Sequence, residues 1–285
     1  MRREAAFGAK SIYAFIVDNN VLMHKEAAQK GSKIIAQWLK QQKKITQPFR
    51  VLDLACGGAP LIPNALMAFA SSARFEYTGV DINADQVEAA RNFKFAKNVK
   101  ARILEEDAWG FKNLGSKKFD FVFIGLNTHH AVPEELAFLA RNVNSLLSPG
   151  GLYINHDKFR PERHRYLPRP DFSATTEKSM RLISIKKLVR ARIPAKSYPF
   201  LQQDQIGGWR EALFQKFYKI MAGLNCNLAS LEFSMEHVRE RDFPVSVREM
   251  HKIFSKAGFK TKIHGYGRNP HPLKQYFSML SAQKI

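Results

Sequence analysis

Hydrophobic residues form short runs from residue 50 onwards, and segments with helical spacing separate these runs. The runs predict five buried strands: Arg50–Leu54, Phe75–Val80, Ala101–Leu104, Phe119–Ile124 and Leu152–Asn155. The segments between them predict three helices: Leu61–Ser71, Ala84–Lys97 and Pro133–Leu147. Alternating strands and helices favour right-handed βαβ units, so we expect a mostly parallel, Rossmann-like sheet with helices on both faces.

The pattern differs before and after this block. Residues 11–42 have helical spacing, and residues 158–245 interrupt the alternation over a length too great for a bare loop. The alternation resumes with a helix at Val247–Ala257 and strands at Lys260–His264 and Tyr276–Ser281. We therefore predict an N-terminal helical cap (1–47), a sheet core (48–157), a helical and basic substrate cap inserted after the fifth strand (158–245), and the core's last helix and strands (246–285).

Charge changes this picture more than overall composition does. The 285 residues are 45% hydrophobic and 25% charged, as in soluble globular proteins, but 45 Lys and Arg against 25 Asp and Glu give a net charge of +20. Residues 158–196 alone hold 12 basic and 3 acidic side chains. This segment is a solvated surface helix, a lid over an anionic substrate, or a contact with nucleic acid or an acidic membrane surface. Arg160 and Arg163 follow the fifth strand closely and are best placed to reach a bound anion.

The two cysteines, Cys56 and Cys226, exclude a disulfide framework and a Cys-rich zinc site. No apolar run approaches the roughly 20 residues that cross a bilayer, and the first residues do not resemble a secretory signal. We therefore expect a cytoplasmic protein. No histidine has the spacing and carboxylate partner of a metal site, so we predict no metal.

Acidic residues end three of the predicted strands, where parallel sheets bind their ligands. Asp53 leads into a glycine turn that lacks the dinucleotide and P-loop spacings, so this carboxylate suits an amine or another cationic group. Asp81 is placed to accept hydrogen bonds from two ribose hydroxyls, and Asp107 from an adenine amine. Together they describe a pocket for an adenosine with a cationic tail. The alternative is that each carboxylate caps a helix or is solvated.

The order of these motifs resembles the class I S-adenosylmethionine-dependent methyltransferases, and in particular their small-molecule branch. The resemblance covers roughly residues 48–157. It rests on Val51–Gly58, Gly79–Asp81, Asp107-Ala108, Phe119–Val122 through His129-His130, and Leu146–Gly151. It implies a seven-stranded sheet whose last strand is antiparallel, with S-adenosylmethionine as methyl donor and S-adenosylhomocysteine as product.

The resemblance also implies the residues of the donor site. The first motif departs from the family pattern at Ala59-Pro60, which could alter the angle of the following helix. The residues carried over are Asp53, Ala55, Cys56 and Gly57 around the methionine part, Asp81 and Ile82 at the ribose, Asp107, Ala108 and Trp109 at the adenine, and Gly125 and Leu126 beside the sulfonium.

The acceptor side is less defined. Asn127-Thr128-His129-His130 stands where DNA and protein-amide methyltransferases have a DPPY-type tetrad, and no cysteine pair serves cytosine methylation. Positioning supplies much of the rate of an in-line displacement, and a base helps if the acceptor is a hydroxyl. The candidate bases are His130, His156 and His237, each with a structural role as the alternative, and His156 with Asp157 forms a possible pair. The expected substrate-binding residues are Asn127, Arg160 and Arg163.

These observations favour methyl transfer to a small molecule, which the basic segment suggests is anionic. An RNA (tRNA or rRNA) methyltransferase is one alternative, motivated by the charge, but the sequence has no recognisable RNA-binding module and few aromatic residues in its basic segment. The other alternative is a non-catalytic S-adenosylmethionine-binding partner subunit. The three strand-end carboxylates argue against it, because a pocket that has lost its function does not require them. The choice among O-, N- and C-methylation, and the oligomeric state, stay open.

Overall fold

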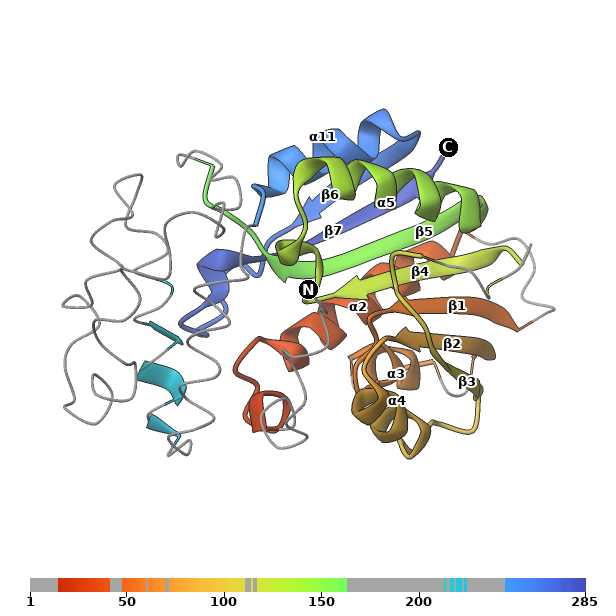
Figure 1. The fold of residues 1–285 in the computed structure, drawn as a ribbon, viewed down its shortest axis with the longest axis horizontal. Helices are drawn as coiled ribbons and strands as arrows, with labels where there is room; N and C mark the ends of the chain where they lie inside the picture. Colours follow the sequence, from red (N-terminus) through yellow and green to blue (C-terminus); the bar gives the residue numbers. More distant parts are fainter. Residues whose placement is uncertain are drawn as a thin grey trace, which may run out of the picture.

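A computed structural model of the chain describes residues 15–41, 48–59, 61–69, 72–110, 114, 117–162 and 244–285, together with part of 213–224 (Figure 1). The predictions that concern the remaining residues lie outside this range. They include His237, Arg163 and most of the proposed 158–245 insertion.

The described chain forms a seven-stranded sheet in the order β3-β2-β1-β4-β5-β7-β6. All neighbouring strands are parallel except β7, which is antiparallel to both β5 and β6, so the predicted mostly parallel sheet with an antiparallel last strand is confirmed. The strands are β1 (Phe49–Leu54), β2 (Phe75–Asp81), β3 (Val99–Glu105), β4 (Phe119–Gly125), β5 (Leu147–Lys158), β6 (Phe259–His264) and β7 (Phe277–Lys284).

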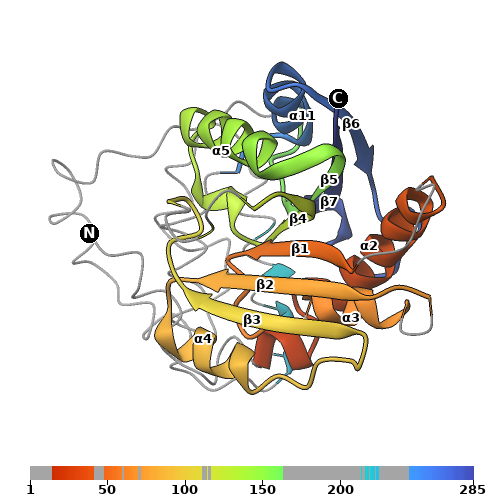
Figure 2. The same cartoon turned by 90° about the vertical axis from the view of Figure 1, so that its right-hand side faces the viewer.

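Helices cover both faces of the sheet (Figure 2). One buried cluster lies between the sheet and α5 and α11, and a second lies between the sheet and α2 and α3. Because strand side chains alternate, Leu52 faces the first cluster and Val51 the second. The helices are α2 (His24–Leu39), α3 (Leu61–Met67), α4 (Ala84–Arg91), α5 (Pro133–Leu146) and α11 (Val247–Lys256), with short 3-10 turns η2 (Thr128–His130) and η4 (Lys274–Tyr276).

The helix α2 belongs to the layer that covers the sheet. Its Trp38 indole donates a hydrogen bond to the carbonyl of Gly150 over 2.9 Å, and its ring packs 4.5 Å from that of Phe121. A turn with left-handed residues at Asn20 and Met23 separates α2 from a helical turn at 15–18. Within the described chain, no helix combines the length and apolarity needed to cross a membrane.

Several boundaries differ from the sequence prediction: α3 ends at Met67 and not at Ser71, and β5 begins at Leu147 and not at Leu152. Two further differences have a physical reason. The strand β5 does not end at Asn155 but continues to Lys158, because its last residues pair with β7. The helix α4 ends at Arg91 and not at Lys97. The aromatic residues beyond it pack in a non-helical segment, with the Phe95 ring 5.1 Å from Phe93 and 5.3 Å from Tyr77.

Candidate functional site

The carboxyl ends of β1, β2, β4 and β5 meet at one edge of the sheet, because these four strands are parallel (Figure 1). The turn that leaves β1 at this edge is strained. Ala55, Gly57 and Ala59 all have left-handed backbones, with φ of 55°, 54° and 61°. Such conformations cost a non-glycine residue about 1–2 kcal/mol and gather at ligand sites. The turn is therefore held in shape by its surroundings.

Asp81, at the end of β2, supplies part of that support. One carboxylate oxygen accepts a hydrogen bond from the backbone N–H of Gly57 over 2.8 Å, and the other accepts one from Asn83 over 2.9 Å. The backbone N–H of Ile82 also contributes, and since a carboxylate has about four lone-pair sites, acceptor capacity remains for a ligand. Burial raises the pKa of Asp81, while the backbone N–H groups oppose that rise. The next residue, Ile82, is exposed beside it.

Asp53 lies at the base of the same turn and is almost entirely buried, with 4% of its surface exposed. Its carboxylate accepts a hydrogen bond of 2.7 Å from the hydroxyl of Tyr77. Burial raises the pKa of Asp53 to about 7, and the charge of Asp81 acts in the same direction. The neighbouring Cys56 thiol is also buried, and burial raises its pKa. Asp53 is thus a buried acid with a raised pKa at the base of the turn.

The third predicted carboxylate, Asp107, is exposed just after β3. Its side chain accepts a hydrogen bond from the N–H of Trp109, which closes a turn around the buried Ala108. The N–H of Glu106 donates to the carbonyl of Asp81 over 2.9 Å and so joins the ends of β2 and β3. Asp107 is thus brought to the same edge as Asp53 and Asp81.

The segment after β4 bends into η2. Leu126 has a left-handed backbone with φ of 53°, and its N–H donates to the carbonyl of His156 on β5. Gly125 sits tightly, since an added Cβ would come 3.0 Å from Leu61. Among the described residues, the buried side-chain oxygen of Asn127 has no hydrogen-bond partner. An unsatisfied acceptor at a strand end suits a ligand that carries a donor.

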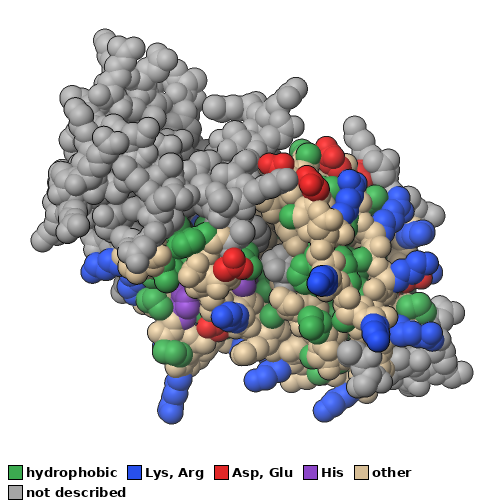
Figure 3. Space-filling model, turned by 90° about the horizontal axis from the view of Figure 1, so that it is seen from below, with side chains coloured by type: hydrophobic (Ala, Val, Ile, Leu, Met, Phe, Trp, Pro, Cys, Tyr) green, Lys and Arg blue, Asp and Glu red, His purple; other side chains and the backbone are tan. Residues whose placement is uncertain are grey.

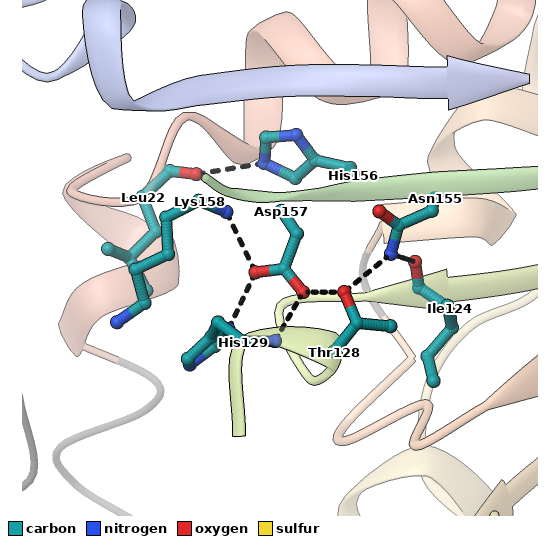
Figure 4. A network of polar contacts seen from close by, with 8 residues as sticks. All are labelled: Leu22, Ile124, Thr128, His129, Asn155, His156, Asp157 and Lys158. Carbon is teal, nitrogen blue, oxygen red and sulfur yellow. Dashed lines mark hydrogen bonds and ion pairs between the residues drawn. The ribbon is translucent and has the colours of Figure 1, made fainter. Parts of the chain in front are cut away.

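A buried polar network joins η2 to β5 (Figure 4). Asp157 receives hydrogen bonds at both carboxylate oxygens, from the Thr128 hydroxyl at 2.5 Å and from Nδ1 of His129 at 2.6 Å, with further bonds from the backbone N–H groups of His129 and Lys158. Asn155 donates to the Thr128 hydroxyl and to the carbonyl of Ile124. Asp157 is fully buried, and burial raises its pKa, which the bonds from Thr128 and Lys158 oppose.

This network assigns the tautomer of His129. An ionised Asp157 only accepts hydrogen bonds, so Nδ1 of His129 carries a proton and the lone pair of the neutral ring lies on Nε2. A carboxylate that orients a histidine in this way is the arrangement found in general bases. Our sequence predictions did not include His129 as a base. The signal was the period of β5, which places Tyr153, Asn155 and Asp157 on the face toward η2.

The two described histidines that the sequence did predict differ from this pair. The His130 ring is half-buried and lies 3.8 Å from that of His129. His156 points to the opposite side of β5 from Asp157, so the predicted pairing of these two side chains is wrong. Its Nε2 contacts the carbonyl of Leu22 at 3.2 Å, and its Nδ1 contacts the Tyr266 hydroxyl at 2.7 Å. Since its Nε2–H must donate to a carbonyl and its Nδ1 accepts from a phenol, His156 has a structural role.

Arg160 is also placed differently from the sequence prediction. Its side chain is 5% exposed and bonds through Nη2 to the carboxylate of Glu249, which closes the capping box of α11 with Ser246. The guanidinium therefore ties the chain after β5 to α11, which does not favour anion binding.

Removing either member of this ion pair should have unequal effects on stability. Glu249→Ala leaves a buried charge unpaired and removes the acceptor for the Ser246 N–H, so we expect the free energy of unfolding to fall by about 3 kcal/mol. Arg160→Met leaves only the partly exposed Glu249 and should cost about 1 kcal/mol. Urea denaturation of both variants measures the difference. A larger loss for Arg160→Met would contradict the structural role.

The surface and the metal-ligand chemistry add two observations. On the face shown in Figure 3, Lys and Arg side chains are spread over the described surface and do not gather in one patch. In the described part of the chain, no three His, Cys, Asp or Glu side chains are grouped as they would be to hold a metal ion.

The sequence matches a known family over the region that builds this edge. Residues 51–151 match the family model described as a methyltransferase domain. No curated protein matches the chain significantly.

Solved structures share the fold at low sequence identity. The chain is similar to the plantazolicin methyltransferase BpumL in complex with SAH, with a TM-score of 0.54, 11% identity, and coverage of 97% of this chain and 90% of that one. It also resembles the CurJ carbon methyltransferase, with a TM-score of 0.52, 14% identity, and coverage of 92% of this chain and 55% of that one. An O-methyltransferase family protein from Burkholderia thailandensis gives a TM-score of 0.52, 12% identity, and coverage of 98% of this chain and 61% of that one. The chain thus spans little more than half the length of the latter two. At these identities the likeness shows the fold.

Proposed function

We propose that this chain, whose residues 51–151 form a methyltransferase domain on the class I fold, transfers a methyl group from S-adenosylmethionine to a small molecule. The observation that carries the proposal is the support of the β1 turn by Asp81. Its carboxylate holds the turn through Gly57 and keeps acceptor capacity for a further donor such as a ribose hydroxyl.

The other residues of the edge fit the same donor. S-adenosylmethionine supplies a methyl group on a positively charged sulfur, attached to an adenosine and to an amino acid. Asp53 would pair with the ammonium group, Asp81 would accept from the ribose hydroxyls, and Asp107 from the adenine amine. The glycine turn lets the backbone approach closely at Gly57. Each of these groups stands at the carboxyl end of a parallel strand or just after it.

On the acceptor side, the pair of His129 and Asp157 is proposed as the base in place of His156, while His130, whose ring lies 3.8 Å from that of His129, stays a candidate. The lone pair on Nε2 of His129 takes the proton that the acceptor loses, and Asp157 stabilises the resulting imidazolium through Nδ1. The side-chain oxygen of Asn127, which is buried at the end of β4, would accept from the same substrate. This arrangement supports an acceptor that carries a removable proton.

A small molecule is favoured over RNA as the acceptor. BpumL is a plantazolicin methyltransferase, so at least one similar fold serves an acceptor other than RNA.

Methyl-labelled S-adenosylmethionine separates the two classes of acceptor. The protein is incubated with the labelled donor and either total cellular RNA or the low-molecular-mass fraction of a cell extract. We expect label in the low-mass fraction and none in RNA above a reaction without enzyme. Transfer to RNA alone would overturn the small-molecule proposal and leave methyl transfer intact.

A further inference from the structure

The hydroxyl of Tyr77 is a buried polar group that the proposed function does not use. Tyr77 lies on β2, with 1% of its surface exposed, and its hydroxyl donates to Asp53 on the neighbouring strand β1. Both side chains are directed to the face of the sheet that α2 and α3 cover, so this contact joins the two adjacent strands inside the core. The hydroxyl of Tyr77 thus has a carboxyl partner in the core, which the hydroxyl of the equally buried Tyr153 lacks among the described residues.

The backbone makes room for this contact. Gly79 is the residue of β2 that pairs with Asp53. A Cβ at Gly79 would come 2.9 Å from the Cys56 sulfur, closer than such contacts are found, and 3.0 Å from the Tyr77 ring, which is tighter than most such contacts. The glycine therefore provides the space in which the Tyr77 ring lies, while Phe95 packs on the ring at 5.3 Å. The direction of the hydroxyl is fixed by this packing.

The surroundings of Asp53 disfavour its ionised form, and Tyr77 is the exception. Burial raises its pKa to about 7 and the negative charge of Asp81 adds to this, whereas the hydrogen bond from Tyr77 lowers it. Cys56 and Tyr77 themselves have raised pKa values, so both stay protonated and uncharged near neutral pH. Tyr77 consequently acts as a donor to Asp53, and this supports the ionised carboxylate over the neutral acid.

We propose that Tyr77 is a positioning residue for the methyl donor and that donor binding is coupled to the loss of a proton from Asp53. The inference rests on the proposed function, because the ligand that would draw this proton off is the ammonium group of S-adenosylmethionine. The proton passes to solvent, and the ion pair between the carboxylate and the ammonium group replaces it. No further reactant is needed.

The sign of the pH dependence follows from this coupling. Below the pKa of the free protein's Asp53, binding must first remove a proton, so the dissociation constant falls about tenfold for each pH unit of increase. Above a pH of about 7 the carboxylate is already ionised and the affinity levels off. Tyr77→Phe removes a hydrogen bond to a charged group and should move the midpoint up by about one to two pH units. At pH 7, where about half of the wild-type Asp53 is already ionised, this corresponds to about 5- to 50-fold weaker binding.

Calorimetric titration with S-adenosylhomocysteine tests the proposal without an acceptor, because this product has the same ammonium group. The titrations run from pH 5 to pH 9.5, a range that includes the expected midpoint of Tyr77→Phe, in buffers of different ionisation enthalpy, which gives the number of protons released. Tyr153→Phe is the matched control, since Tyr153 is another fully buried sheet tyrosine whose hydroxyl has no partner among the described residues. Asp53→Asn has no proton to lose and gives the ligand's own pH dependence.

We expect the wild type and Tyr153→Phe to release close to one proton at pH 6 and to share one midpoint, which Tyr77→Phe shifts upward. A wild-type midpoint in Tyr77→Phe would overturn the role of Tyr77, and absence of proton release by the wild type would overturn the coupling. If Tyr77→Phe does not fold, the wild-type proton release and its loss in Asp53→Asn decide the coupling, and Gly79→Ala tests the positioning by displacing the ring. Failure of the wild type to bind at any pH would instead reject the proposed function.

Discussion

Asp81→Ala should weaken the binding of S-adenosylhomocysteine by about 100-fold or more. The substitution removes the acceptor for the ribose hydroxyls, and hydrogen bonds to a charged group each contribute about 1.5–3 kcal/mol. It also removes the acceptor that holds the N–H groups of Gly57 and Asn83, so the strained turn after β1 loses its support. Titration calorimetry of purified wild type and variant gives the ratio of dissociation constants.

The matched control for this substitution is Asp120→Ala. Asp120 also accepts a hydrogen bond from a backbone N–H, that of Arg50, but it lies near the amino end of β4, at the opposite edge of the sheet. This control should bind like the wild type. An equal loss in both variants would point to a general effect on stability, and unchanged affinity in Asp81→Ala would reject the ribose assignment.

His129→Gln should lower the rate of methyl transfer by about 10²- to 10⁴-fold, the usual contribution of a general base. Glutamine fills a similar volume but cannot take up a proton. Affinity for S-adenosylhomocysteine should change less than twofold, because the donor site is assigned to other residues. The rate is measured as label transferred to the low-mass acceptor fraction.

Two further variants separate a catalytic from a structural role. Asp157→Asn has nearly the same volume, but its NH2 group replaces one of two oxygens that both accept hydrogen bonds, so it no longer holds His129 or stabilises an imidazolium there, and the rate should also fall while donor affinity is kept. His251→Gln, at a histidine of α11 that contacts Thr261, should retain the wild-type rate. Full activity in His129→Gln, with loss of activity in His130→Gln, would assign the base to His130 instead.

Periodicity and strand-end chemistry predicted most of the fold. The alternation between Arg50 and Asn155 predicted the parallel strands, because buried parallel strands are nearly continuous apolar runs. The prediction stopped β5 too early at Asn155-His156-Asp157, since polar residues were interpreted as a strand end. In the structure Asn155 and Asp157 are buried on one face and bond to η2, while His156 bonds on the other face.

The candidate site was harder to predict from the sequence, because its contacts join residues that are far apart along the chain. His129 and Asp157 are 28 residues apart, as the chain runs through α5 between them, and no spacing rule connects them. Tyr77 and Asp53 are likewise joined only once β1 and β2 are in register. By contrast, Asp53, Asp81 and Asp107 each follow a predicted strand, so their common edge could be inferred from the parallel sheet alone.

The central claim is that the edge formed by Asp53, Asp81 and Asp107 binds the methyl donor. Calorimetric titration of the wild-type protein with S-adenosylhomocysteine at pH 7.5, where Asp53 is mostly ionised, tests this claim most directly. We predict saturable binding of one ligand per chain, with adenosine alone binding more weakly because it lacks the ammonium group. Folded protein that binds neither ligand would contradict the account.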